Sequence, residues 1–491
     1  MPTATPPVAA TPVAVTPAAP IRTAERIRGI DIARGLALLG ILLVNVRFFF
    51  APFASGLRPV QVDSMPVPDI FDIAAWAFVE TFATFKCISL FSMLFGFGLA
   101  LQSARVEAAG GSRWVFGLRR LGVLLAVGLV HGFLVWYGDI LTLYAVLGVG
   151  VLVALALPPR WLLRVAGLVA ALLLLLSIGA ATVQYATASH PEWFQRPAVV
   201  ATETPDTTGA ADPGEATDSI SSTDSTDSSA STGAAEGNGA AASSDPAAED
   251  GTAPRGVDAM LAAGFDFNSQ TWMEAEIAAY RDGPFVHALA FRATSYAIAL
   301  LAAPFGYGWH AFAMMLFGAW AYRTGLFAGD ESSPGASRRR RRRAAACIVL
   351  GTPLAAGAVL PWLMLGLESP LALALHTVFL ELGGLVLPIG YACAIVEYGP
   401  RLPRVLAVAL ERAGRMAMSI YLCESLVCVT LASWWGFGWF GSMQDGRLTL
   451  VAVAVWASLV MGAALWLGRY RIGPAEWLWR RLSYGRNPVE P

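Results

Sequence analysis

The chain has 491 residues, of which 56% are hydrophobic and 14% are charged, and its formal net charge at pH 7 is −1. A soluble protein carries about 25% charged residues, so this composition excludes an ordinary soluble domain. Runs of about twenty apolar residues recur along the chain, each long enough to cross a bilayer as a helix. We therefore predict an all-α fold, a polytopic transmembrane helix bundle.

About ten apolar segments are predicted to cross the membrane, with a range of 9 to 11. They form an N-terminal half within residues 25–185 and a C-terminal half within residues 284–485. A further segment, 285–303, carries Arg292 near its middle, which is costly inside a bilayer. We expect that segment to be peripheral, re-entrant or half-spanning. The ten predicted crossings are 30–50, 84–104, 117–137, 140–158, 161–183, 308–327, 344–366, 371–397, 407–433 and 448–468.

Two stretches lack the apolar residues needed to fold. Residues 1–24 are rich in Ala, Pro, Thr and Val, which predicts a disordered cytoplasmic tail. Residues 186–283 separate the two halves and are largely Ser, Thr, Ala, Gly and acid, which predicts a low-complexity acidic insert outside the cytoplasm. Near its end, "TWMEAEIAAY" has the pattern of an amphipathic helix that lies on the membrane surface.

Arginines set the predicted orientation. With ten crossings, all the arginine-rich connections fall on one side, which the positive-inside rule makes cytoplasmic. Both termini are then cytoplasmic, and the chain is expected in the cell inner (plasma) membrane. The connections that carry this argument include residues 22–28, 105–120, 160–164, 338–343, 401–415 and 469–481.

The sequence predicts no metal site and no permanently bound cofactor. The five cysteines show no metal-ligand spacing and are interpreted as packing residues. Phosphate-binding loops and dinucleotide fingerprints are absent from the sequence. The expected partner is the lipid bilayer, with no nucleic acid, and the sequence leaves the small-molecule substrate and the oligomeric state open.

Arg28, Asp31 and Arg34 open the first predicted crossing. Asp31 and Arg34 are three residues apart and so share a helix face. One interpretation is a cytoplasmic cap with snorkelling arginines. The other is a mixed-charge mouth that binds a phosphate-bearing donor. Asn45 ends the same helix, near the predicted outer surface.

His131 lies within the third predicted crossing and Asp139 in the turn after it. A histidine at that depth is either a hydrogen-bonded core residue or a general base or acyl carrier. Tyr144 follows in the next helix and has a hydroxyl to donate.

Further polar residues lie in or beside apolar segments and are either interhelical hydrogen-bonding groups or parts of a site. Glu424 needs a partner if buried, and Lys86 and His131 are the candidates. The other members of this group are Glu381, Arg415 and Tyr421.

Four stretches in this order resemble the YeiB-like family of bacterial membrane proteins, a family of unknown biochemical function. They are "RGIDIARGLALLGILLVNV", "FKCISLFSMLFGFGLALQ", "RRLGVLLAVGLVHGFLVWYGDILTLYAVLG" and "AGRMAMSIYLCES". In the last stretch, Ser419, Ile420 and Glu424 stand where the family more usually has Thr, Asn and Gln.

More distantly, the chain is similar to membrane acyltransferases of the heparan-glucosaminide N-acetyltransferase type. The shared opening "R-x-x-D-x-x-R-G" is matched here by Arg28, Asp31, Arg34 and Gly35. That resemblance implies acyl transfer from a cytoplasmic acyl-CoA to an acceptor at or across the membrane. The family's catalytic histidine has no counterpart in residues 51–83, and His131 is the candidate replacement.

The sequence therefore leaves two functions open. One is an acyltransferase with a donor site at Arg28, Asp31 and Arg34, and with His131 and Asp139 in catalysis. The other is a small-molecule transporter or exporter that uses the buried polar residues as a pathway.

Overall fold

The structure is a computed structural model that describes residues 27–57, 62–190, 256–305, 307–327, 335–366 and 369–484. Within these residues the regular structure is helical throughout, and several helices are apolar and long enough to cross a membrane. The predicted all-α, membrane-type helix bundle is thereby confirmed. The predicted tail 1–24 and most of the predicted insert lie outside the described residues.

Eight helices of the described chain meet the length and composition of a membrane crossing, or nine if the bent pair α15–α16 counts as one. Two other predicted crossings, α6 (Leu141–Ala154) and α11 (Tyr307–Arg323), have 14 and 17 residues and are shorter than the rest. The eight are α1 (Arg28–Phe50), α3–α4 (Ile70–Phe82 and Lys86–Ala108), α5 (Arg113–Leu134), α7 (Pro159–Ser189), α10 (Phe285–Ala302), α12–α13 (Ala336–Ala356 and Leu360–Leu365), α14 (Pro370–Tyr398, continued by the 3-10 turn η4, Gly399–Arg401) and α17 (Asp445–Arg469).

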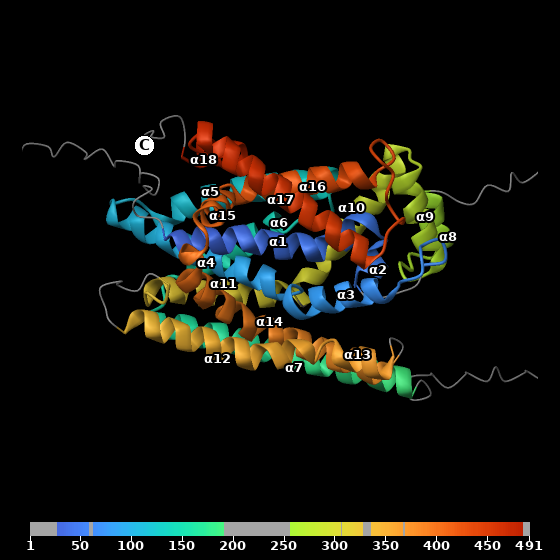
Figure 1. The fold of residues 1–491 in the computed structure, drawn as a ribbon, viewed down its shortest axis with the longest axis horizontal. Coiled ribbons are helices and arrows are strands. Elements are labelled where there is room, and N and C mark those ends of the chain that lie inside the picture. The colour runs from blue at the N-terminus through green and yellow to red at the C-terminus, as the bar shows by residue number, and fades with distance from the viewer. Residues whose placement is uncertain are drawn as a thin grey trace, which may run out of the picture. The chain divides into compact units, whose positions relative to one another are not determined.

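The first helix, α1, is apolar around its whole circumference, which is typical of a helix inside a bundle. It packs against α4, α14, α16 and α17, and against α15 (Arg404–Arg415), so most of its residues are buried (Figure 1). In contrast, α7 exposes a long apolar face that includes Leu168, Leu172 and Leu175. A large exposed apolar face on a helix of this length is what lipid contact requires.

Two ends of the bundle differ in charge. The end where α1 begins collects arginines, and we call it the basic end. There Arg340, Arg341 and Arg401 all bind the Glu397 carboxylate, so the six-arginine run lies beside the end of α14. The predicted gathering of these arginines at one end is present, while the side of the membrane that this end faces stays a prediction.

Backbone breaks fall at three predicted crossings: at the start of 84–104, inside 344–366 between α12 and α13, and inside 407–433. Segment 84–104 is preceded by α3, and the break falls at Phe85, whose φ of 63° is rare for a residue with a side chain. Segment 407–433 bends by 86° at Met416, between α15 and α16 (Ala417–Ala432). Hydropathy gives the apolar length but is blind to such breaks, because they depend on tertiary contacts.

Residues 285–303 form α10, which joins α11 through the 3-10 turn η3 (Ala303–Phe305). Arg292 in α10 bonds to the C-terminal end of α5, while Arg323 at the end of α11 bonds to the carbonyl groups of Leu155 and Leu157 at the basic end. The two helices together therefore connect the ends of the bundle once. Length and composition alone allow α10 to cross a bilayer, so its predicted partial crossing stays a prediction.

At the opposite end, α2 (Phe53–Leu57), α8 (Val257–Ala262) and α9 (Gln270–Arg281) gather (Figure 1). The predicted amphipathic helix is α9, and its apolar face packs on the chain itself. Glu276 lies on that face, fully buried, and accepts a hydrogen bond from the Phe53 amide at 3.2 Å. Burial raises the pKa of Glu276 to about 8, because the charged form loses its hydration.

This shift predicts a pH-dependent stability. The folded state binds the Glu276 proton more tightly than the unfolded state, so the contribution is largest below about pH 4.5 and is lost as pH rises toward 8. Glu276→Gln should remove this loss, worth about 1.4 kcal/mol per pH unit across that window. Thermal unfolding of the detergent-solubilised protein at pH 5 and pH 8 measures it.

Glu274→Gln is the matched control, because Glu274 is on the same helix but only half-buried. A Glu276→Gln protein whose melting temperature follows pH as the parent does would contradict the assignment.

Candidate functional site

A cavity of about 460 Å³ opens at the basic end of the bundle. Its wall combines the start of α1, the second half of α4, the first half of α5, the start of α6 and the start of α16 with α18 (Pro474–Tyr484). The segments that form it are thus separated by more than four hundred residues in the chain. A cavity of this size holds a small molecule or part of a larger one.

The mouth of the cavity is strongly basic. Five arginines and two carboxylate residues line it, an excess of three positive charges. Guanidinium groups bind phosphate and carboxylate in two-point contacts, so such a lining favours an anionic ligand. The arginines are Arg34, Arg105, Arg120, Arg415 and Arg480, and the acidic residues are Asp31 and Glu476.

Asp31 and Arg34 form an ion pair of 3.0 Å and both line the cavity, as predicted from their spacing. A close approach between α1 and α15 holds them there, since a Cβ at Gly414 would lie 1.8 Å from the Asp31 carbonyl oxygen. Arg28 does not line the cavity and instead pairs with Glu411 at 2.9 Å. Of the three residues predicted to form the mouth, Asp31 and Arg34 line the cavity and Arg28 does not.

Two interactions hold helix α18 in the cavity wall, one made by Glu476 and one by Trp479. Glu476 accepts hydrogen bonds from the Met418 and Ser419 amides at 2.8 and 3.0 Å and from the Ser419 hydroxyl at 2.5 Å. These amides start α16, where a negative charge is favourable. Trp479 packs with Arg120, whose guanidinium carbon lies 3.6 Å from the indole ring centre.

Aromatic and apolar residues line the deep part of the cavity. The Tyr144 hydroxyl lies 2.6 Å from the Ser92 hydroxyl, and the Tyr421 oxygen accepts the Ile140 amide at 3.3 Å. Both tyrosines belong to the predicted polar set, and both line the cavity. The cavity is therefore amphipathic, with charge at the mouth and apolar surface inside.

His131 and Asp139 lie directly behind Tyr421. His131 Nδ1 is 2.9 Å from Asp139 Oδ1, and the other Asp139 oxygen accepts the Thr142 amide at 2.8 Å. The His131 ring centre is 5.3 Å from that of Tyr421. His131 Nε2 is buried and has no hydrogen-bond partner in the described part of the chain. An imidazole oriented by a carboxylate, with its other nitrogen unoccupied, is the arrangement of a general base.

The remaining predicted residues lie elsewhere. Lys86 is fully buried at the break before α4 and donates to the Glu80 carbonyl oxygen at 2.8 Å. Glu424 is buried, and its Oε1 has no partner among the described residues, so neither Lys86 nor His131 supplies the expected pair. Asn45 is half-buried in α1 and does not line the cavity.

Sequence reasoning missed His310 and α18, whereas Glu381 belongs to the predicted polar set. Glu381 pairs with His310 at 2.7 Å, and His310 Nε2 lies 2.6 Å from the Ser89 hydroxyl. The rule that singled out His131, a histidine inside an apolar segment, also applies to His310. In the sequence, residues 469–481 stand out only as an arginine-rich connection, because nothing local in α18 shows that it returns to the start of the chain. Among the described residues, no group of three or more His, Cys, Asp or Glu side chains is placed to bind a metal ion.

The fold and this cavity define a multi-helix membrane protein with an arginine-lined cavity at one end. Residues 321–486 match the family described as "Protein of unknown function (DUF418)". No solved structure matches the chain significantly.

The chain is 28% identical to the uncharacterized protein YeiB of Escherichia coli K12 over 470 residues, covering 94% of this chain and 96% of that protein. It is 27% identical to the uncharacterized protein YxaH of Bacillus subtilis 168, covering 95% and 96%. An uncharacterized 39.9 kDa protein of Bacillus acidopullulyticus is 37% identical over 130 residues, which are 26% of this chain and 34% of that protein. The predicted resemblance to YeiB-like proteins is confirmed over nearly the full length.

The anchor of α18 generates a prediction. Glu476→Ala leaves the Met418 and Ser419 amides without their acceptor, which should cost about 1–2 kcal/mol of stability. Hydrogen exchange of residues 417–420 and 474–484 should accelerate about tenfold. Glu411→Ala, which removes a more exposed carboxylate at the same end, is the control. Unchanged exchange in α18 would show that Glu476 does not hold this helix in place.

Proposed function

We propose that this chain is an acyltransferase of the bacterial inner membrane, which takes an acyl group from a cytoplasmic acyl-CoA. The observation that carries the proposal is the amphipathic cavity, with five arginines at its mouth and an apolar interior that ends at Tyr421. An acyl-CoA has the same division, with phosphates at one end and an acyl thioester at the other. The arginines at the mouth match the phosphates in charge.

The His131–Asp139 pair supplies the chemistry in this proposal. Asp139 holds the proton on Nδ1 and leaves Nε2 to accept a proton from the acceptor's hydroxyl or amine. The acceptor oxygen or nitrogen then bonds to the thioester carbon, the C–S bond breaks, and the proton passes from Nε2 to the thiolate. Tyr421 separates donor and base, so its ring has to turn aside for the reaction.

Donor binding is the first test. Arg415→Gln combined with Arg480→Gln should weaken binding of acetyl-CoA and hexanoyl-CoA by at least tenfold, because each substitution removes a charge-assisted contact. Isothermal titration of the purified protein measures this affinity. Arg160→Gln is the control, since Arg160 is exposed at the same end but does not line the cavity. A parent protein that binds neither thioester would contradict the proposal and favour transport.

The catalytic pair is tested separately. His131→Gln and Asp139→Asn should each leave donor affinity within about twofold but lower acyl transfer or CoA release by about 10²–10⁴, the usual contribution of a general base. Release of free CoA with time, in the presence of membrane lipids as acceptors, gives the rate. Unchanged release in His131→Gln would remove His131 from the mechanism.

A further inference from the structure

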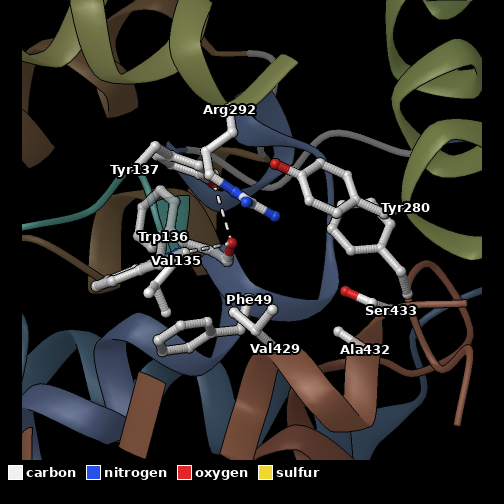
Figure 2. Close-up of a pocket in the computed structure, with 11 residues that line it drawn as sticks. Phe49, Val135, Trp136, Tyr137, Tyr280, Arg292, Val429, Ala432 and Ser433 are labelled. Atoms are coloured by element: carbon white, nitrogen blue, oxygen red, sulfur yellow. Dashed lines mark hydrogen bonds between the residues drawn. The ribbon is translucent and has the colours of Figure 1, made fainter. Parts of the chain in front are cut away.

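A second hollow lies at the end of the bundle opposite the arginines (Figure 2). It has a volume of about 10 Å³, about the size of one water molecule. Two aromatic stacks form its walls, Phe49 on Trp136 with ring centres 4.0 Å apart and Tyr280 on Phe440 with ring centres 4.6 Å apart. In Figure 2 the Arg292 side chain points between Tyr137 and Tyr280.

Arg292 is a buried cation in this hollow, with 2% of its surface exposed. Its Nη1 donates to the Leu134 carbonyl oxygen at 2.6 Å, and its guanidinium lies 5.8 Å from the Tyr280 ring centre. No carboxylate of the described chain lies within 4.0 Å of it. The C-terminus of α5 offsets about half a charge. Buried charges are normally paired, so this one is incompletely neutralised.

The nearby Glu276 does not supply the missing charge. It acts electrostatically on Tyr137 and Tyr280 and is therefore in the same region, but its hydrogen bond goes to the Phe53 amide. Because burial raises the pKa of Glu276 to about 8, this carboxyl is mostly protonated at pH 7. The region thus keeps a net positive charge.

The two hollows share two lining helices, α1 and α16. Helix α1 contributes Ile41 to the basic cavity and Phe48 to the aromatic hollow, and α16 contributes Tyr421 to the first and Val429 to the second. At 1.5 Å per residue, these positions are about 10–12 Å apart along the bundle. The layer between them contains His131, whose Nε2 is unpartnered.

We propose that the aromatic hollow is the closed form of a binding site for a small hydroxyl-bearing organic anion, whose carboxylate or phosphate pairs with Arg292. Aromatic faces bind the rings and C–H groups of such a molecule, and the Tyr137 and Tyr280 hydroxyls bind its oxygens. Binding displaces Tyr280 from Phe440 and opens the hollow. If the proposed function holds, this anion is the acyl acceptor and reaches His131 from the side opposite the donor. The anion site itself does not rest on the proposed function.

Calorimetric titration of the full-length protein with gluconate, glucose 6-phosphate and neutral glucose tests the site. The two anions should bind saturably, and glucose at least tenfold more weakly. Arg292→Gln should weaken anion binding at least tenfold, and Arg292→Lys, which keeps the charge, should weaken it less. Arg281→Gln, a partly exposed arginine on α9, should bind as the parent does.

Arg415→Gln shows which of the two cavities binds the anion. It alters the basic cavity and should leave anion binding at Arg292 within twofold of the parent. Anion binding that survives Arg292→Gln but is lost in Arg415→Gln would place the anion in the other cavity and overturn the proposal. Equal binding of glucose, or no binding of either anion to the folded parent, would also overturn it. Anion binding at Arg292 without acyl transfer from any donor would leave this site standing and refute the proposed function alone.

Discussion

The contact between the backbones of α1 and α15 is the constraint on which the basic cavity depends. Gly35 and Gly414 leave no space for a side chain: a Cβ at Gly35 would lie 2.4 Å from the Leu410 carbonyl oxygen. This approach fixes the Asp31–Arg34 pair beside the 86° bend that starts α16. Because the bend exposes the first amides of α16, a carboxylate from α18 can bind there. The mouth, the wall and the bend therefore form one unit.

Much of the fold is predictable because it depends on local properties. Apolar length defines a helix in a bilayer, and α1, α5, α7, α14 and α17 coincide with predicted crossings. The breaks at Phe85 and Met416 were not predictable in this way, because each is stabilised by residues distant in sequence. At the Met416 bend the partner is Glu476, which accepts from the Met418 amide 58 residues earlier in the chain.

In the candidate site, too, the pairs that are close in sequence are predictable and the distant contacts are not. Asp31 with Arg34 and His131 with Asp139 are close in sequence, and helical spacing or a short turn is enough to pair them. In the sequence, Arg105, Arg120 and Arg480 are visible only as topology signals, since a positive-inside pattern is the same whether or not the side chains converge. The pairing of Glu381 with His310 joins two helices with no local signal that links them.

The basic cavity is lined by the first and the last helices of the described chain, α1 and α18. During synthesis α18 is made more than four hundred residues after α1. A chain that has inserted as far as α14 already contains Asp31, Arg34, His131 and Asp139, but lacks the wall that carries Glu476 and Arg480. The basic cavity is thus complete only once α18 has been made, and a chain that lacks α18 lacks this wall.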